Sequence, residues 1–400
     1  KIDDHLHVNI SGYQVVKNNE DNKKTPTTFP YIKYSAGTYK FGQTNYSQKI
    51  SFYNIFRDKS TDDHAQRQQK LYHNISTDYE FYNFKSKLNF KTELLTQYYN
   101  INNKQIKYAE SDFSGSYARI FPMSGLYLET PIVNPKRNIQ INPKVSFIFN
   151  GSQSSSEKIS NEESTNNIYF FLNNNNLNRY TGTDKLDNSK RVNYGFDFIK
   201  DLFKVELSQS YEFDVNSNYN HDVGLTDHLS DLLGSAEYDG EKHNFGHSFR
   251  LDPDVGKFKQ QSISYSNKSF LGNSSIVYAE SKSETNNILK KQSETLDLSF
   301  GSNKILNYST IAITSTFDLI KDDPSKYTFK YEYFDECFGL NLDFGRNFYA
   351  DRDLKPNDTL TILFSFKHLG TYKSTNLAVS ETDKQDIRWE AGQIDNRLFD

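Results

Sequence analysis

Apolar and polar residues alternate along most of this chain, with the period of two that is typical of β-strands. From about Tyr31 onward, the alternation runs through segments of roughly ten residues, separated by clusters of Gly, Asn, Asp, Lys and Pro. Residues 191–198 are a clear case, with Val192, Tyr194, Phe196 and Phe198 on one face and Arg191, Asn193, Gly195 and Asp197 on the other. We count about eighteen such segments, including one near the N-terminus at residues 6–16.

Strands in this number, joined along the chain in hairpins, are best satisfied by a closed sheet. Closure removes the unpaired strand edges that a lipid bilayer cannot solvate. We therefore predict an all-β fold, a transmembrane antiparallel β-barrel, of which about eighteen strands are visible. We expect residues 1–370 to form this barrel and residues 371–400 to form a C-terminal tail, with no boundary that splits the barrel into separate domains.

The predicted connections between strands differ in length, and barrels of this kind have short periplasmic turns and longer outer loops. Counting back from a last strand that ends near Leu369 places the turn at 335–337 on the periplasmic side. The two longest connections, 173–190 and 214–230, then both fall outside. The segment 150–168 is polar and low in complexity, which predicts a loop. The other outer loops are expected near 253–256, 284–292, 320–325 and 350–357, and the other inner turns near 200–202, 240–242, 268–271 and 302–305.

Composition supports a membrane-spanning sheet over an ordinary soluble domain. Tyr (28 residues) and Phe (31 residues) make up nearly all of the 15% aromatic content, which favours strands. The mean hydropathy is −0.78 and only 35% of residues are hydrophobic, values that would give a soluble protein a thin core. A transmembrane barrel has apolar side chains only on its lipid face, so a hydrophilic average agrees with that architecture.

Several other classes are excluded or disfavoured. No apolar run approaches the roughly 18 residues of a spanning helix, which excludes a helical membrane protein. The net charge of −4 gives no electrostatic reason to expect a nucleic acid partner. The first residues lack the apolar region of a signal peptide, so we expect a mature product or a piece of a longer one. The single cysteine, Cys337, is either a reduced thiol or is paired with a cysteine outside this segment.

Clusters that would support metal binding or catalysis are weak. His5 and His7 alternate along one segment and His243 and His247 lie four residues apart, but the Cys/His clusters of structural zinc sites are absent, so we expect no metal and no cofactor. The acidic and histidine residues of the 214–230 loop invite comparison with outer-membrane hydrolases. A solvated polar loop explains them more simply, so we expect no catalytic residues and no enzyme.

Three stretches resemble the lipopolysaccharide-assembly outer-membrane protein family, LptD, also called organic solvent tolerance protein. The first, 176–195 (NLNRYTGTDKLDNSKRVNYG), looks like that family's Asn-Arg-aromatic-x-Gly-x-Asp loop followed by an Arg-x-Asn-Tyr-Gly strand start. The second, 229–252, runs from LSDLLGSAEY to a strand that ends FRLD. The third, 333–370, is similar to the C-terminal pattern of an acidic-Cys turn, an Arg-Asp-x-x-Pro loop and a final Phe-Lys-x-Leu-Gly strand. The stretches occur in the family's order and spacing, and the earlier part of the chain fits the family only loosely.

This resemblance implies an architecture and a set of partners. Family members are barrels of about 26 strands, preceded by a periplasmic jelly-roll domain that receives lipopolysaccharide from a bridge protein. A lipoprotein plugs the barrel, and the lipid leaves sideways between the first and last strands. We therefore expect lipopolysaccharide, a plug lipoprotein, the bridge protein and outer-membrane lipid as partners. This chain lacks the jelly-roll and has too few strands, so we expect its N-terminal part, including the first gate strand, to be missing. The last gate strand, 358–369, is present and carries Leu360, Ile362, Phe364 and Phe366.

The resemblance also assigns roles to single residues. Family members carry a cysteine at the turn of Cys337 and pair it with a cysteine in the N-terminal region, and the loop count places Cys337 on the same periplasmic side. A free thiol is the alternative. At the outer rim, we expect Arg346, Arg352 and Asp353 to form ion pairs, with contact to lipopolysaccharide phosphates as the alternative.

The loop of the first matching stretch is rich in hydrogen-bonding groups. We expect it to fold into the lumen and to contact the plug lipoprotein or the sugar head of the lipid, through Asn178, Arg179, Tyr180, Gly182 and Asp184. An ordinary turn with an Asn and Gly signature is the alternative.

The leading hypothesis is a non-enzymatic barrel of the outer membrane that assembles lipopolysaccharide into the outer leaflet. A generic porin or uptake barrel is the second hypothesis, and an outer-membrane hydrolase or adhesin is the third. A translocon predicts an upstream jelly-roll domain that contains cysteines, whereas a porin predicts neither. A hydrolase predicts rim carboxylates and histidines whose removal abolishes turnover.

Overall fold

The structure is a computed structural model, and most of the chain that it describes is β-strand. It describes residues 6–14, 26–57, 64–83, 85–106, 112–152, 157–164, 169, 171–215, 223–225, 227–285, 288–303, 308–348, 357–367, 370–373 and 377–378. Within these residues, 21 strands belong to one sheet, and the one helix, α1 (Phe171–Asn174), is a single turn. No helix in the described residues is long and apolar enough to cross a membrane.

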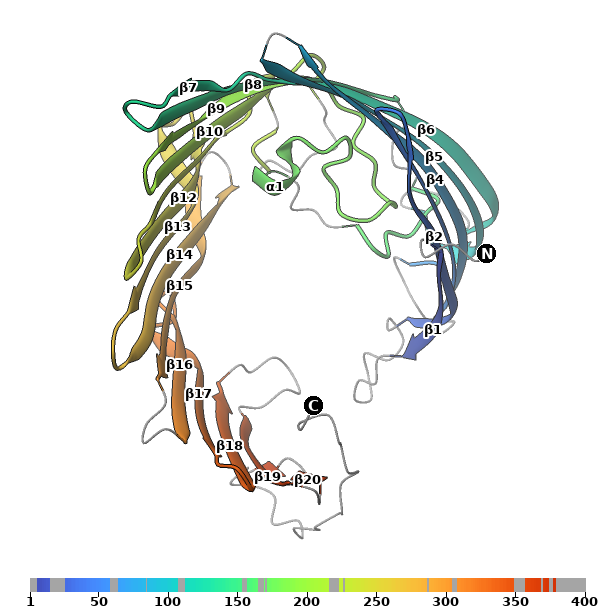
Figure 1. The fold of residues 1–400 in the computed structure, drawn as a ribbon. Helices are drawn as coiled ribbons and strands as arrows, with labels where there is room; N and C mark the ends of the chain where they lie inside the picture. Colours follow the sequence, from blue (N-terminus) through green and yellow to red (C-terminus); the bar gives the residue numbers. More distant parts are fainter. Residues whose placement is uncertain are drawn as a thin grey trace. The chain divides into compact units, whose positions relative to one another are not determined.

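The first of two compact units contains residues 1–200, 206–233 and 252–255. Its strands pair antiparallel along the chain, and the β4–β5 ladder runs without a register shift from Arg67↔Asn102 to Asn83↔Ser86. They form a curved sheet, and α1 lies with the neighbouring loop on the concave side (Figure 1). Its strands are β1 (Leu6–Gln14), β2 (Thr27–Phe41), β3 (Thr44–Phe56), β4 (Arg67–Asn83), β5 (Ser86–Lys104), β6 (Phe113–Glu129), β7 (Ile132–Asn134), β8 (Ile139–Asn150), β9 (Lys190–Lys200) and most of β10 (Phe203–Glu212).

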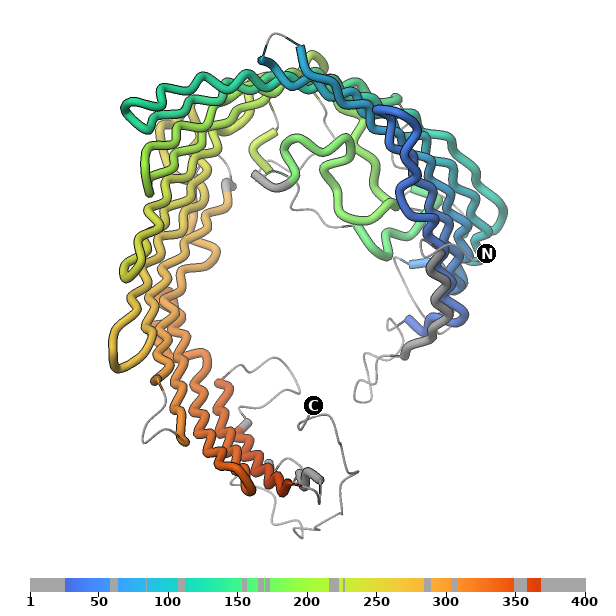
Figure 2. Tube along the Cα trace, viewed as in Figure 1, coloured from blue at the N-terminus to red at the C-terminus, as the bar shows by residue number. Residues whose placement is uncertain are grey.

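The second unit contains residues 201–205, 234–251 and 256–400. Figure 2 traces its strands as successive antiparallel passes. After β19 the chain adds two short strands, and both pair with β19 itself. The strands are most of β11 (Leu232–Asp239), β12 (His243–Asp252), β13 (Lys257–Lys268), β14 (Gly272–Thr285), β15 (Ile288–Ser302), β16 (Ser309–Asp318), β17 (Asp323–Phe334), β18 (Phe338–Asn347), β19 (Asn357–Phe366), β20 (Gly370–Lys373) and β21 (Leu377–Ala378).

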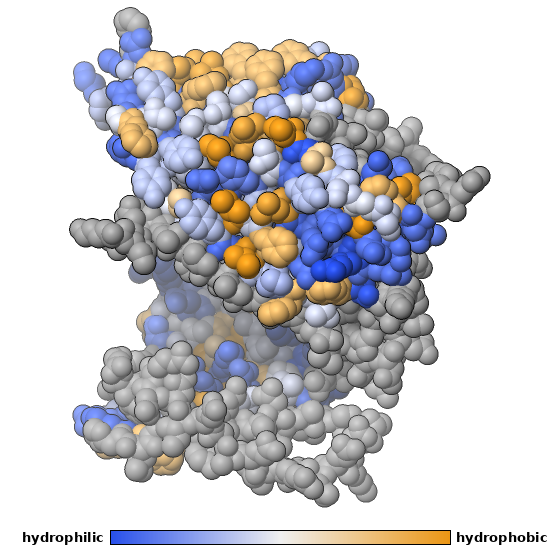
Figure 3. All heavy atoms as spheres, turned by 90° about the vertical axis from the view of Figure 1, so that its right-hand side faces the viewer, coloured by the Kyte–Doolittle hydropathy of each residue, from blue (hydrophilic) through white to orange (hydrophobic). Residues whose placement is uncertain are grey.

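The two faces of the first unit's sheet have opposite chemistry. On β6, Ile120 is 61% exposed, whereas its neighbours Arg119 and Phe121 are 2% and 0% exposed. On β9, Tyr194 is exposed and Arg191 is fully buried, as the alternation predicts. Figure 3 shows apolar side chains on the outward side of the β2–β6 region, interspersed with hydrophilic ones. The sheet therefore presents apolar side chains outward, whereas its inward side buries charged side chains beside an apolar cluster that includes Phe121.

Connections in the first unit are short at one end of the strands and long at the other. β2 and β3 are joined at residues 42–43 and β4 and β5 at 84–85, while the opposite end carries the 57–66, 105–112 and 151–189 connections. These connections therefore fall into the two length classes that the sequence predicts.

In the second unit the inner turns at 240–242 and 335–337 lie where predicted. The expected loop at 284–292 is wrong, because β14 and β15 continue to Thr285 and from Ile288. Polar residues in this segment pair between β14 and β15 beyond the apolar part of the two strands. A prediction based on polarity therefore ended the strands too early.

Candidate functional site

The connection between β8 and β9 lies on the concave, polar face of the first unit (Figure 1). It carries the five residues expected to form a luminal loop: Asn178, Arg179, Tyr180, Gly182 and Asp184. We call its described part, residues 157–164, 169 and 171–189, the inner loop. Two buried groups of charged residues connect the inner loop to the strands.

The first group, the Asp184 anchor, is built around the buried carboxylate of Asp184. Its Oδ1 accepts hydrogen bonds from Lys70 Nζ at 2.7 Å and Tyr99 Oη at 3.0 Å. Its Oδ2 accepts backbone N–H groups of Glu162 at 2.9 Å and Glu163 at 3.3 Å. A buried carboxylate is stable only when it is paired and hydrogen-bonded, and Asp184 meets both conditions.

Strands β4, β5 and β6 supply the wall side of this anchor. Lys70 on β4 also pairs with Glu163 of the inner loop at 2.5 Å. Arg119 on β6 donates through Nη2 to the backbone carbonyls of Thr183 at 2.8 Å and Asp184 at 2.7 Å. Both cations occupy inward positions of alternating strands, so the same pattern that builds the sheet brings them to the loop.

The second group, the Asp187 anchor, joins the inner loop to β9 and β10. Arg179 donates to both carboxylate oxygens of Asp187, at 2.6 and 3.2 Å, and to Glu212 Oε1 at 2.7 Å. Arg191 Nη1 reaches Asp187 Oδ2 at 3.4 Å. The side chains of Arg179, Asp187 and Glu212 are at most 1% exposed, and a bidentate Arg–carboxylate pair suits such a site geometrically.

The remaining predicted loop residues shape the segment between the anchors. Gly182 has φ +79°, and a Cβ there would lie 2.5 Å from the Glu163 carbonyl oxygen, so both backbone and space favour glycine. Asn178 Oδ1 accepts N–H groups of Tyr180 at 3.3 Å and Asp187 at 3.2 Å. Burial, with a smaller effect of the Asp187 carboxylate, raises the pKa of Tyr180 to about 12.

The structure thus brings all five predicted residues into one anchored loop, and their expected contacts with a plug lipoprotein or a sugar remain predictions. Sequence reasoning missed the partners Lys70, Arg119, Asp187 and Glu212. Three of these, Lys70, Arg119 and Glu212, could have been found in the sequence as charged residues at inward positions of strands. A buried charge at such a position needs a partner.

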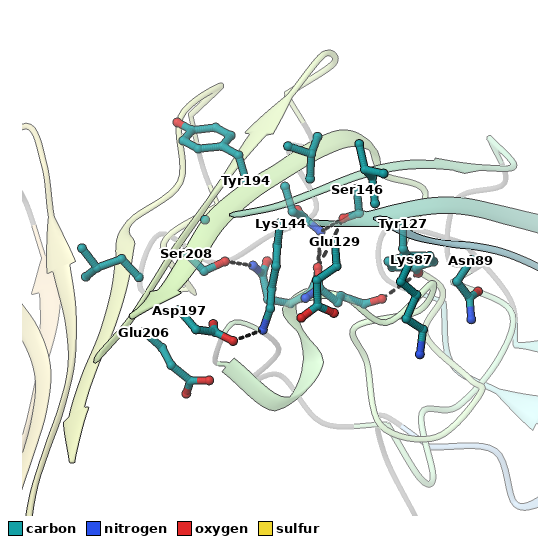
Figure 4. A pocket seen from close by; sticks show the side chains of 17 residues that line it. Lys87, Asn89, Tyr127, Glu129, Lys144, Ser146, Tyr194, Asp197, Glu206 and Ser208 are labelled. Carbon is teal, nitrogen blue, oxygen red and sulfur yellow. Dashed lines mark hydrogen bonds and ion pairs between the residues drawn. The ribbon is translucent and has the colours of Figure 1, made fainter. Parts of the chain in front are cut away.

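Two cavities of about 370 and 300 Å³ lie between the inner loop and the strands, and a third of about 320 Å³ is lined by residues of β2 to β5 alone. Around the first of these, Lys87, Glu129 and Glu206 project to the same side of the sheet, whereas Tyr194 points to the opposite side (Figure 4). Lys144 pairs with Asp197 at 2.5 Å across this cavity wall. We call the first the terminal cavity, the second, which contacts the inner loop most, the middle cavity, and the third the distal cavity.

Cys337 lies in the tight turn between β17 and β18 and is exposed and unbonded to sulfur. Asp335 Oδ1 accepts the backbone N–H groups of Cys337 at 2.8 Å and Phe338 at 2.7 Å. These two hydrogen bonds hold the pKa of the Asp335 carboxyl below its usual range. The thiol is therefore presented at the apex of an ordered turn.

The expected last gate strand is β19, which carries Leu360, Ile362, Phe364 and Phe366. One edge pairs with β18 along its whole length, and the other pairs with β20 from Leu363 to Phe366 and with β21 at Thr359 and Leu360. One edge of β19 is therefore fully paired, and the other edge is paired over part of its length.

Of the expected outer-rim charges, Arg346 lies at the end of β18, opposite Asp358 in register. Its Nε is 3.5 Å from Asp358 Oδ1, and its guanidinium lies over the Phe348 ring, 4.9 Å from the ring centre. Arg352 and Asp353 lie outside the described residues.

Side chains of the 214–230 connection contact neighbouring strands and the inner loop. His228 Nδ1 lies 2.8 Å from the Glu212 backbone oxygen, and the Ser230 hydroxyl lies 2.5 Å from Tyr169 Oη. Residues 216–222 and 226 lie outside the described part of the chain. Within the described part, no group of three or more His, Cys, Asp or Glu side chains is placed to hold a metal ion.

Comparison with known proteins identifies a family. The family model of LptD, described as LPS transport system D, matches residues 5–305. No curated protein matches the chain.

Several solved structures are similar to this chain at low sequence identity. The siderophore receptor PirA from Acinetobacter baumannii is 8% identical with a TM-score of 0.46, and the match covers 93% of this chain and 71% of the receptor. The FrpB iron transporter from Neisseria meningitidis is 9% identical with a TM-score of 0.35, covering 98% of this chain and 72% of the transporter. A Rhodopseudomonas blastica porin variant is 9% identical with a TM-score of 0.32, covering 80% of this chain and 96% of the porin.

Because the family model spans well over half of the sequence, the chain belongs to the LPS transport system D family, which confirms the resemblance, the antiparallel outer-membrane β-barrel class and the outer-membrane location predicted above.

Proposed function

We propose that this chain forms the barrel part of a translocon that assembles lipopolysaccharide into the outer leaflet. Family membership supports lipopolysaccharide transport in general. The observation that carries the finer proposal is the two-faced sheet, whose polar side holds an anchored loop and a row of cavities. Such a surface suits a charged, sugar-rich head group, while the apolar outward face suits lipid tails.

In this proposal the lipid leaves sideways at the edge of β19 that β20 and β21 cover only in part. A plug lipoprotein and a periplasmic bridge protein act with the barrel. The inner loop contributes to the route by narrowing the polar side of the first unit. The barrel performs no covalent chemistry, because moving an intact lipid between leaflets requires neither bond cleavage nor bond formation. We propose that residues 1–370 form the barrel and residues 371–400 a C-terminal tail, whose first residues pair with β19 through β20 and β21.

Depletion of the intact protein in its own host tests this function. We expect newly made lipopolysaccharide to lose its accessibility to a lipid A deacylase added outside the cells, while an unrelated outer-membrane porin still reaches the surface. If lipopolysaccharide stayed accessible and only the uptake of small solutes fell, an uptake barrel would replace the translocon.

We also propose that Cys337 forms a disulfide with a cysteine that this sequence does not contain. Its exposure in an ordered turn supports that pairing, and the periplasm is an oxidising compartment. The full-length protein should migrate differently on gels with and without reductant, and Cys337→Ser should abolish the difference. A Cys337 that reacts fully with maleimide in unreduced cells would show a free thiol instead.

A further inference from the structure

We infer that the neighbouring strands β13, β14 and β15 carry, near their outer end, a binding site for the phosphate groups of an outer-leaflet lipid (Figure 1). All of its residues belong to the second unit, and none belongs to the inner loop. The outer end of these strands leads into the connections at 253–256 and 286–287, which the loop count places outside the membrane. The inference goes beyond the proposed function, because it rests on the outer-membrane location and the family's lipid and not on transport through the barrel.

One face of these three strands is apolar along the middle of the strands. Residues that share this face lie in rows across the strands, and two exposed members, Tyr265 and Ile276, are opposite each other. Such a face suits the acyl chains of a lipid. The apolar row nearest the outer end consists of Ile263, Tyr278 and Leu296.

Beyond this apolar row, the same face becomes charged. The first charged row contains two glutamates that lie directly opposite each other on β14 and β15, and the second contains two lysines in the same arrangement. The face therefore changes from apolar to carboxylate to ammonium within about four residues of each strand. The first charged row consists of Gln261, Glu280 and Glu294, and the second contains Lys282 and Lys291.

A β-bulge brings Lys291 onto this face. The register between β14 and β15 shifts after Ser281, which leaves Gln292 as the extra residue. In a regular strand Lys291 and Glu294 would point to opposite faces, because they are three residues apart. Here Lys291 Nζ lies 2.7 Å from Glu294 Oε2 and 3.7 Å from Glu280 Oε1. Bulges commonly re-aim a side chain in this way beside functional sites.

The two carboxylates are held in place before any ligand binds. The side chains of Glu280 and Glu294 are only 6% and 14% exposed. Tyr278 Oη donates to Glu294 Oε1 at 2.8 Å, and Gln261 Nε2 donates to Glu280 Oε2 at 2.8 Å. Lys282 Nζ lies 3.2 Å from Glu280 Oε2. The carboxylates therefore fix the positions of the lysine side chains, and a preformed site loses less conformational entropy on binding.

The lysine row lacks an anion of its own. Two like charges directly opposite each other destabilise a sheet, and Lys282 and Lys291 form such a pair. Their side chains are 24% and 49% exposed, so a ligand reaches them from outside. Alternation places Lys259 on the same face, two residues before Gln261. Three lysines thus outnumber two glutamates, and a phosphate in contact with them would form charge-assisted hydrogen bonds and reduce the repulsion.

The order of the rows indicates the kind of ligand. In a lipopolysaccharide the phosphates are attached to the sugars that carry the acyl chains, so they lie directly beyond the apolar layer of the membrane. The apolar and lysine rows occur in this order toward the outer end. A free phosphate ion would use the lysines alone. We therefore assign the site to the phosphorylated sugar head of an outer-leaflet glycolipid.

Binding of fluorescent lipid A to the intact protein in detergent tests this site. The probes are lipid A with two phosphates and monophosphoryl lipid A. We expect the diphosphorylated probe to bind about fivefold more tightly, the effect of about one charge at a membrane surface. Lys282→Gln with Lys291→Gln should remove this preference, and Lys282→Arg with Lys291→Arg should keep it. Inorganic phosphate should compete poorly, because it makes no contact with the apolar rows.

Lys321→Gln with Lys330→Gln is the matched control. It removes the same charge from the same unit, and each of these lysines also pairs with one carboxylate, that of Asp318 or Asp343. A preference that survives the change of Lys282 and Lys291, or that the control loses equally, would overturn the inference. Full competition by inorganic phosphate would replace the lipid with a free anion.

This site and the proposed function can fail separately. Surface display of lipopolysaccharide is measured in cells and does not enter the binding experiment. Normal display with no phosphate preference would refute the site alone. Display that is unaffected by depletion of the protein would refute the translocon and leave the site standing.

Discussion

At the residue scale, a few buried charged side chains hold the inner loop in place. Removing any one of them should lower the free energy of unfolding, because it leaves a buried partner unpaired. Asp184 and Glu163 both pair with Lys70, but the Asp184 side chain is 2% exposed and the Glu163 side chain is 36% exposed. The two ion pairs share the Lys70 ammonium group but differ in how far the carboxylate is buried. The buried pair should matter for stability, and the exposed pair should matter little.

We predict that Asp184→Ala lowers the free energy of unfolding by about 3–5 kcal/mol, because it leaves the buried Lys70 short of a partner. Glu163→Gln should cost about 0–1 kcal/mol. Urea unfolding of the purified protein in detergent measures both. Equal losses in the two variants would contradict the assignment of Asp184 as an anchor.

At the scale of elements, the alternation of apolar and polar residues was sufficient to predict β9 and the face of the sheet on which each of its side chains lies. It was also sufficient to place the 335–337 turn, because Asp335 and Cys337 interrupt two apolar segments. It did not predict that Arg179 pairs with Glu212, because these residues are 33 positions apart and meet only when β10 pairs beside β9. It misplaced the β14–β15 connection, because polar side chains are common both in loops and at strand ends.

The β17–β18 turn carries a prediction about pH. The pKa of Asp335 is lowered by hydrogen bonds from the N–H groups of Cys337 and Phe338, and further by Tyr333 Oη. A carboxyl whose folded pKa lies below its unfolded value of about 3.9 stabilises the fold above that value. This contribution is lost as the pH falls through the lowered folded pKa.

We therefore expect the amide of Cys337 to become less protected from hydrogen exchange as the pH falls from about 5 to about 2, after correction for the intrinsic exchange rate. In Asp335→Asn the corrected protection should not change with pH over this range. Hydrogen exchange followed by mass spectrometry measures both proteins. The same acid response in both would show that another group controls the turn.

At the scale of the whole molecule, one sheet has an apolar outward face and a polar inward face. We assign the lipid head group to the inward face. Family membership shows the transport class, and the inner loop with its cavities supports a route along the first unit. The sequence pattern predicts the strands and the loop, but it does not show the cavities, because these form only when the strands pair and the inner loop packs against them.

Photocrosslinking in living cells tests whether lipopolysaccharide moves along the polar face of the first unit. A photoreactive phenylalanine analogue replaces Lys91, which lines two of the cavities, or Ile141, which is exposed on the outward face near a short turn. We predict that lipopolysaccharide is captured at position 91 and not at position 141. Capture at position 141 alone, or at neither position while lipopolysaccharide still reaches the cell surface, would contradict a route along the polar face.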